Sequence, residues 1–222
     1  MNSLILCLHV AAICGLTLFA LRCGLLFMIA WLCLLALTMN LFVLKQINLF
    51  GLSVTSSDAL AVGYLLGLNL IQEFFGRKSA RTCVWISLFI SGCFVLLSQI
   101  HLLYLPNDYD LTQGHFTALF KPVPRILFAS LFSFFVVQFV DMAFFGFLKE
   151  KSGRKYLPGR TVLALVVSQV LDTLIFSFLG LYGLVASLTP IIFLSLIVKG
   201  VVILLSIPFV SLTKKVVRDV QV

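Results

Sequence analysis

Two acidic residues lie inside long apolar stretches of this sequence, and each follows a glutamine by three positions. Gln138 and Asp141 form the first pair, Gln169 and Asp172 form the second, and a Phe follows each Asp by four residues. Because positions i and i+3 share a helix face, each Gln should point the same way as its Asp. An Asp at a bilayer centre costs roughly 2.5–3.5 kcal/mol on insertion scales. Two such costs at matching places predict two facing helices that present amides and carboxylates to a polar cavity.

A lysine, Lys199, also stands well inside an apolar run, near the depth expected for Asp172. A buried ammonium group needs a counter-charge, and Asp172 or Asp141 is the partner that we expect. Two interpretations stay open. The pair can contribute to a binding site, or it can be a purely structural ion pair that fixes the register of two helices.

A second polar group, Asn69, Gln72 and Glu73, precedes the basic turn Gly76-Arg77-Lys78. Glu73 lies about one helical turn from the end of its apolar segment. It can therefore extend to the membrane interface or pair with Arg77 or Arg81, in place of a role in the site.

The composition of the whole chain is that of a membrane protein. Of 222 residues, 61% are hydrophobic and only 11% are charged, whereas a soluble domain carries about 25% charged residues. Mean hydropathy is +1.15. Runs of about twenty apolar residues recur along nearly the whole length, which predicts a polytopic membrane protein.

Seven apolar segments are long enough to cross a bilayer, and each should be helical because irregular backbone cannot face lipid. They are residues 3–21, 25–44, 57–75, 82–104, 124–148, 161–182 and 187–212. The first segment lacks the basic start and the cleavage site of a signal peptide, so we expect it to be retained. The long connection after residue 104 contains a stretch, 111–120, that is expected to form a short interfacial helix or a lid.

The distribution of basic residues between the segments predicts the orientation. One set of alternate connections holds twelve: Arg22, Arg77, Lys78, Arg81, Lys149, Lys151, Arg154, Lys155, Arg160, Lys214, Lys215 and Arg218. The opposite set holds three: Lys45, Lys121 and Arg125. The positive-inside rule then places the C-terminus in the cytoplasm and, with seven spans, the N-terminus outside. The net charge of +8 is thus explained by topology, and we expect no nucleic-acid partner.

Several chemistries find no support in the sequence. His101 and His115 have no companion ligands at metal spacing, so we expect no metal site. No Gly-x-x-x-x-Gly-Lys stretch occurs, which argues against ATP hydrolysis by this chain. An intramembrane aspartyl protease also needs two Asp on neighbouring helices, but its Gly-x-Gly-Asp pattern is missing before Asp172. We therefore expect neither a cofactor nor an enzymatic activity.

The residues from Asn69 to Arg81, Asn-Leu-Ile-Gln-Glu-Phe-Phe-Gly-Arg-Lys-Ser-Ala-Arg, resemble the third-span signature of the queuosine precursor transporter family. This family is also called the vitamin uptake transporter family. The segment Arg125–Ser130, the two Gln-x-x-Asp pairs and the later Lys199 resemble the family's order and spacing. The resemblance covers roughly residues 40–210. The sequence departs from the family at Asn69, where Asp is usual.

The resemblance implies an all-α polytopic fold with a six-helix transporter core similar to the substrate-binding subunits of energy-coupling vitamin transporters. Residues 1–23 would be an extra N-terminal span, and residues 24–222 a single transporter domain of about six helices. It implies import of 7-deazaguanine bases such as preQ0, preQ1 or queuine across the cell inner membrane, for salvage into tRNA modification.

The candidate substrate-binding residues are Asn69, Glu73, Gln138, Asp141, Gln169, Asp172 and Lys199. Their chemistry suits a deazaguanine, because carboxylates accept from its N–H edge, an amide can donate to its carbonyl and Phe faces can stack on its ring. The alternative is a substrate-capture subunit for another small heterocycle, docked to an ATP-driven module. The small-residue pair Gly63 and Gly67 can serve such docking, or internal helix packing, equally well. A homo-oligomer also stays open.

Overall fold

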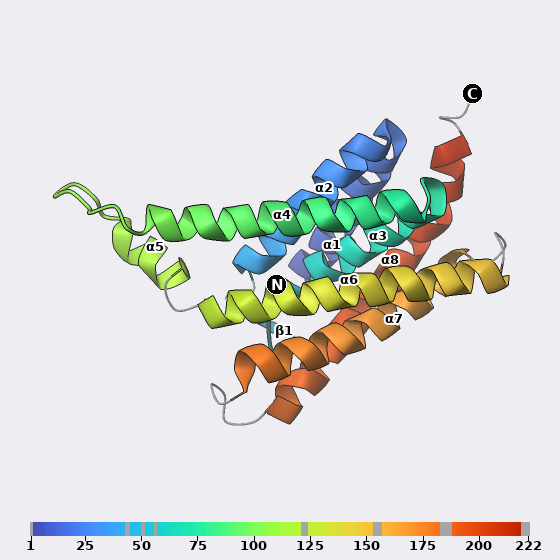
Figure 1. Cartoon of the computed structure of the whole chain (residues 1–222). Coiled ribbons are helices and arrows are strands. Elements are labelled where there is room, and N and C mark those ends of the chain that lie inside the picture. Colours follow the sequence, from blue (N-terminus) through green and yellow to red (C-terminus); the bar gives the residue numbers. More distant parts are fainter. Residues whose placement is uncertain are drawn as a thin grey trace.

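Seven long helices run roughly side by side in the computed structural model of the chain (Figure 1). The structure describes residues 2–42, 45–49, 52–55, 57–120, 124–152, 157–182 and 188–218. In those ranges the long helices are α1 (Asn2–Cys23), α2 (Leu25–Phe42), α3 (Asp58–Phe74), α4 (Arg77–His101), α6 (Pro124–Ser152), α7 (Leu157–Phe176) and α8 (Leu188–Arg218). The seven predicted segments are therefore confirmed as helices.

Six of these helices, all except α3, contain stretches that are long and apolar enough to cross a membrane. Helix α3 has 17 residues, or about 26 Å of length, and it packs against α1, α2, α4, α6, α7 and α8. Its polar residues Asp58, Asn69 and Gln72 are buried. A central position removes these side chains from lipid, where they would be costly. The chain is thus an all-α polytopic membrane protein, as predicted.

A short antiparallel hairpin between α2 and α3 was not foreseen from the sequence. Strand β1 (Gln46–Leu49) pairs with β2 (Leu52–Thr55), with Gln46 opposite Thr55 and Leu49 opposite Leu52. The hairpin packs against α1 and α8. Apolar and polar residues alternate in both strands, the pattern of a half-buried hairpin. Strand pairing satisfies the backbone groups where the helices end.

The connection after α4 contains the short helix α5 (Gln113–Phe120), which confirms the helix expected within 111–120. Asp110 caps its start: the carboxylate accepts hydrogen bonds from the Thr112 hydroxyl and backbone N–H, both 2.7 Å, and from the Gln113 N–H at 3.1 Å. These bonds, led by the Thr112 hydroxyl, lower the pKa of the Asp110 carboxyl group. The ring of His101 packs edge-on against Phe116 at 5.4 Å.

The two ends of the bundle differ in the elements that they contain. The hairpin end holds β1 and β2 and the starts of α3, α6 and α8, whereas the basic end holds the ends of α3 and α6 and the start of α7. Figure 1 shows α5 beside the far end of α4, away from the basic end.

The small residues Gly63 and Gly67 of α3 face inward, toward other helices of the same chain. A Cβ added at Gly63 would meet the Ile13 side chain of α1, and one added at Gly67 would meet Leu32 of α2. Close helix approach through small residues is the usual packing device in membranes. This pair therefore serves internal packing, and it holds α1 and α2 against the central helix.

We expect Gly67→Ala to lower the free energy of unfolding by roughly 1–3 kcal/mol, because the new methyl group overpacks a contact with fully buried Leu32. Gly92→Ala on α4 is the matched control, since no atom lies within 4 Å of an added Cβ there. The control should be neutral or slightly stabilising. Thermal unfolding of both purified variants in detergent measures the difference, and equal stability of the two would contradict the packing role.

Candidate functional site

A cavity of about 90 Å³ lies in the half of the bundle nearer the hairpin end. That is space of the order of six to nine water-sized groups. The start of α3, the first half of α6, the end of α7 with the following π-helical turn η1 (Ser177–Leu181), and the first half of α8 surround it. Its polar lining residues are Ser57, Asp58, Ser130, Gln138, Gln169, Asp172, Thr173, Ser177, Ser195 and Lys199.

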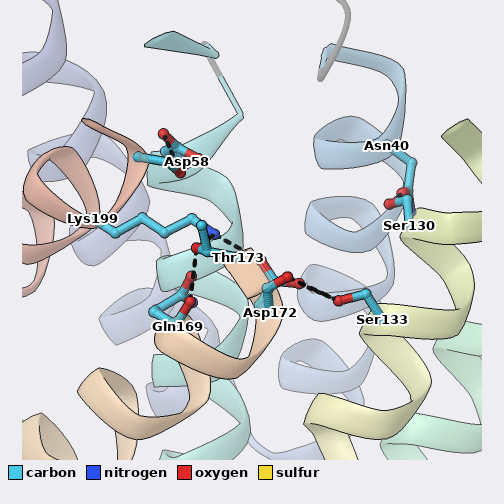
Figure 2. Close-up of polar contacts among 9 residues, drawn as sticks. Asn40, Asp58, Ser130, Ser133, Gln169, Asp172, Thr173 and Lys199 are labelled. Carbon is cyan, nitrogen blue, oxygen red and sulfur yellow. Dashed lines mark hydrogen bonds and ion pairs between the residues drawn. The ribbon is translucent and has the colours of Figure 1, made fainter. Parts of the chain in front are cut away.

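An ion pair between α7 and α8 crosses one wall of this cavity (Figure 2). The Lys199 ammonium donates to Asp172 Oδ2 at 2.7 Å and to the Thr173 hydroxyl at 3.0 Å. From the other side, the Ser133 hydroxyl donates to Asp172 Oδ1 at 2.9 Å. This confirms Asp172 as the predicted partner of Lys199. The Lys199 side chain is only 5% exposed, whereas 25% of the Asp172 side chain remains open.

The two predicted glutamines both line the cavity with hydrogen-bonding capacity left over. Gln138 and Gln169 are each 2% exposed. Among the described residues, neither the amide nitrogen nor the amide oxygen of Gln169 has a hydrogen-bond partner, and the Gln138 oxygen also lacks one. Buried polar atoms are nearly always paired in native proteins. Unpaired amides at a cavity wall therefore indicate that the cavity takes a polar occupant.

Aromatic rings provide much of the apolar part of the wall, together with aliphatic side chains. Tyr64 of α3 and Phe134 of α6 meet edge to face with ring centroids 4.8 Å apart, and Phe176 of α7 lies on the same cavity. Aromatic faces next to amides and carboxylates suit a flat heterocycle with a polar edge.

Asp58, at the first turn of α3, is a cavity residue that the sequence did not single out as a site candidate. The Ser195 hydroxyl lies 3.5 Å from both of its carboxylate oxygens, and the Lys199 charge also acts on it. Figure 2 shows Asp58 above Lys199, on the side opposite Gln169. An Asp at the very start of an apolar segment was the available signal, but the same position fits an ordinary helix start.

Asp141 does not line the cavity, contrary to the expectation that both aspartates would face it. It is fully buried, and the Ser168 hydroxyl donates to its Oδ1 at 2.6 Å. On α6, Asp141 lies eight positions beyond Ser133 (141 minus 133), the residue that contacts Asp172. Eight residues of helix correspond to about 12 Å. Since α6 and α7 are antiparallel, the same Gln-to-Asp order places the two carboxylates at different levels.

Asn69 and Glu73 also lie outside the cavity lining. Asn69 is fully buried beside Asp141, and the Glu73 carboxylate pairs with Lys149 at 3.4 Å and with Arg160 at the basic end. The expectation of Arg77 or Arg81 as partners of Glu73 was wrong. Arg77 and Arg81 are exposed, whereas Lys149 and Arg160 come from α6 and α7, which both pack on α3.

Glu73, Lys149 and Arg160 form a cluster, called the Glu73 cluster, and further contacts join it to the helices around it. Lys149 Nζ also donates to the backbone oxygens of Gln72 and Glu73, and the Gln72 amide donates to the Met142 backbone oxygen at 3.0 Å. The Arg160 guanidinium stacks over the Phe145 ring, 5.3 Å from its centroid. Helices α3, α6 and α7 are thus closed together at the basic end, while the cavity lies toward the hairpin end.

A cavity among helices that can span a membrane, lined by amides, carboxylates, one lysine and aromatic rings, is the arrangement of a membrane protein that binds a small polar solute. The sequence profile of the family described as "Putative vitamin uptake transporter" matches residues 59–213. The chain therefore belongs to this family of membrane transporters, which confirms the resemblance found in the sequence. The matched range begins after α2 and the hairpin, so the division of the chain at residues 23 and 24 stays a prediction.

A relative from Bacillus subtilis (strain 168) is described as "Probable queuosine precursor transporter". It is 29% identical over 190 residues, which cover 81% of this chain and 80% of that protein. No solved structure matches the chain.

Proposed function

We propose that the chain imports queuosine precursors, that is, 7-deazaguanine bases such as preQ0, preQ1 or queuine, for salvage into tRNA modification. The unpaired buried amides of Gln138 and Gln169 in the cavity wall carry this proposal. The similarity to a Bacillus subtilis protein described as a queuosine precursor transporter supports the substrate class.

The cavity offers complementary groups to such a base. A deazaguanine has a row of N–H donors beside a carbonyl acceptor. The Asp172 carboxylate can accept from the N–H groups, and the Gln169 amide can donate to the carbonyl. Tyr64, Phe134 and Phe176 provide ring faces and edges for the flat bicycle. Since Lys199 is balanced by Asp172 and the cavity holds a second carboxylate, Asp58, the site disfavours a phosphate.

The charge distribution along the chain predicts its orientation in the membrane. We place the chain in the cell inner membrane with the basic end and the C-terminus in the cytoplasm, because basic connections stay inside. The cavity then lies in the outer half of the bundle, and the Glu73 cluster closes the cytoplasmic half. This arrangement corresponds to a state that receives solute from outside.

Cysteine labelling in intact cells tests this orientation. In a variant without native cysteines, a new cysteine at exposed Asp108 is expected to react with an impermeant reagent added outside, and one at exposed Glu150 is not. Reaction of Glu150→Cys from outside, with Asp108→Cys protected, would show that the orientation is inverted.

Uptake by the purified chain in proteoliposomes tests the substrate class. Labelled 7-deazaguanine bases should enter saturably, with guanine as competitor. Gln169→Leu should weaken the apparent affinity about tenfold, because it removes one hydrogen bond to the bound base. Gln113→Leu, on α5 and outside the cavity lining, is the matched control and should behave as wild type.

Two outcomes count against this assignment. Absence of saturable entry for every deazaguanine would overturn the substrate class, and unchanged affinity in Gln169→Leu would remove the amide from the site. Uptake only after addition of an ATPase module would instead identify a substrate-capture subunit.

A further inference from the structure

The acidic residues buried in the bundle differ in whether a cation accompanies them. Glu73 pairs with two basic side chains at the basic end, Asp172 pairs with Lys199, and the Lys199 charge also acts on buried Asp58. Asp141, by contrast, forms no ion pair with any residue in the described ranges, although it is fully buried. An ionised carboxylate without a counter-charge is the costliest group to bury.

The side chains around Asp141 are neutral. Ser168 of α7 donates to its Oδ1, and α3 contributes the Asn69 amide and, as the titratable group that faces it, the Tyr64 phenol. From α4, the Cys83 thiol adjoins Tyr64, and the turn η1 contains no titratable residue.

The unpaired atoms around Asp141 are complementary to a bound proton. Asp141 Oδ2 has no hydrogen-bond partner among the described residues, and neither the amide oxygen nor the amide nitrogen of the adjacent Asn69 has one. Protonation of Oδ2 removes the uncompensated charge and provides an O–H group that can donate to the Asn69 amide oxygen. The Asn69 N–H can donate to either form of the carboxyl group, but in the ionised form the negative charge has no cation beside it among the described residues.

The position of Asp141 connects this proton to the solute path. Asp141 lies on α6 three residues beyond Gln138, so the two share a helix face, with Asp141 nearer the basic end. On that side the Glu73 cluster and the bond from Gln72 to the Met142 carbonyl close the bundle. Asp141 therefore lies between the solute cavity and the closed end.

We propose that Asp141 is a proton-binding site that couples import of the solute to entry of one proton. The inference rests on the proposed import function and adds an energy source to it. A proton from outside water binds the Asp141 carboxylate while the solute occupies the cavity. Opening of the basic end releases the solute and the proton into the cytoplasm. Asp141 then stays ionised until the protein returns to the state that receives solute from outside. No bond in the solute changes.

Proteoliposomes that contain the purified full chain allow coupling to be separated from transport. The probe is labelled preQ0, an uncharged base, measured both in exchange without a pH gradient and in net uptake with the outside made acidic. For one proton per solute, a gradient of one pH unit should support about tenfold accumulation by wild type. A protonophore should abolish the accumulation and leave exchange intact.

Asp141→Asn keeps the shape of the protonated acid but cannot release a proton. This variant should retain exchange within about twofold of wild type, and it should lose the accumulation driven by the pH gradient. Asp108→Asn removes an exposed carboxylate instead and should accumulate preQ0 as wild type does. Gradient-driven accumulation that persists in Asp141→Asn, or is missing in a wild type that exchanges normally, would overturn the proposal.

An infrared measurement on the same protein needs no substrate. A protonated carboxylic acid has a carbonyl band that an ionised carboxylate lacks, so wild type at neutral pH should show this band and Asp141→Asn should not. Absence of the band from wild type would refute the proton site. If wild type showed the band but exchanged no deazaguanine, the proton site would stand and the proposed substrate would fail.

Discussion

Replacement of Lys199 by Met is expected to destabilise the protein by about 3 kcal/mol and to abolish uptake. The substitution leaves the Asp172 carboxylate with the Ser133 hydroxyl but without its cation. Removal of one partner of a buried pair typically costs roughly 3–5 kcal/mol. Because a quarter of the Asp172 side chain is open to the cavity, solvent compensates part of the loss and the lower end of that range applies.

The double variant Lys199→Met with Asp172→Asn separates stability from transport. Removal of both charges should restore most of the stability, because no uncompensated charge remains. Uptake should stay lost, since the carboxylate proposed to accept the N–H edge of the base has gone. Lys45→Met, at an exposed lysine near the hairpin, is the control for loss of a positive charge. Thermal unfolding and uptake of these three variants and of wild type decide the matter, and recovery of uptake by the double variant would restrict the pair to a structural role.

The second large effect is expected at the basic end, where Arg160→Met should lower the free energy of unfolding by roughly 3 kcal/mol or more. Arg160 and Glu73 are nearly inaccessible, with 2% and 5% of their side chains exposed. Loss of the guanidinium leaves Glu73 with Lys149 alone, at 3.4 Å, and also removes the contact with the Phe145 ring. Because Lys149 is partly exposed, it is a weaker counter-charge, and a buried carboxylate that loses its buried partner is strongly destabilising.

Lys149→Met is the matched comparison, because Lys149 contacts the same carboxylate but is 31% exposed. Its loss should cost only about 1 kcal/mol, in the range of solvent-exposed ion pairs. Addition of Glu73→Gln to Arg160→Met should recover part of the lost stability. Chemical unfolding in mild detergent gives these differences, and equal effects of the two single substitutions would contradict the assignment of Arg160 as the main partner.

Much of the architecture was predictable because the determining interactions are local in sequence. A run of about twenty apolar residues must form a helix in a bilayer, whatever its neighbours are, and the long helices lie where those runs lie. The free-energy cost of burying a charge also predicted the partner of a single side chain. Lys199 required a counter-charge, and the structure provides Asp172, one of the two acids foreseen.

Only the tertiary structure determines at which level of the bundle each polar group lies and which group it contacts. Helical periodicity determines which side chains share a face, but not the level at which two helices meet. Gln138 and Gln169 both line the cavity, as the repeated Gln-x-x-Asp pattern predicts. Because α6 and α7 are antiparallel, however, Asp172 lies at the cavity and Asp141 lies beyond it.

The same reason explains two further features that could not be predicted from the sequence, the partner of Glu73 and the hairpin. Glu73 pairs with Arg160, 87 positions away (160 minus 73), while nearby Arg77 stays exposed, because helix packing selects partners by space and not by distance along the chain. The strands β1 and β2 form where backbone groups need partners at the end of the bundle. The sequence therefore determined which segments span the membrane and which charges require partners. Only packing of the helices determined where those charges meet.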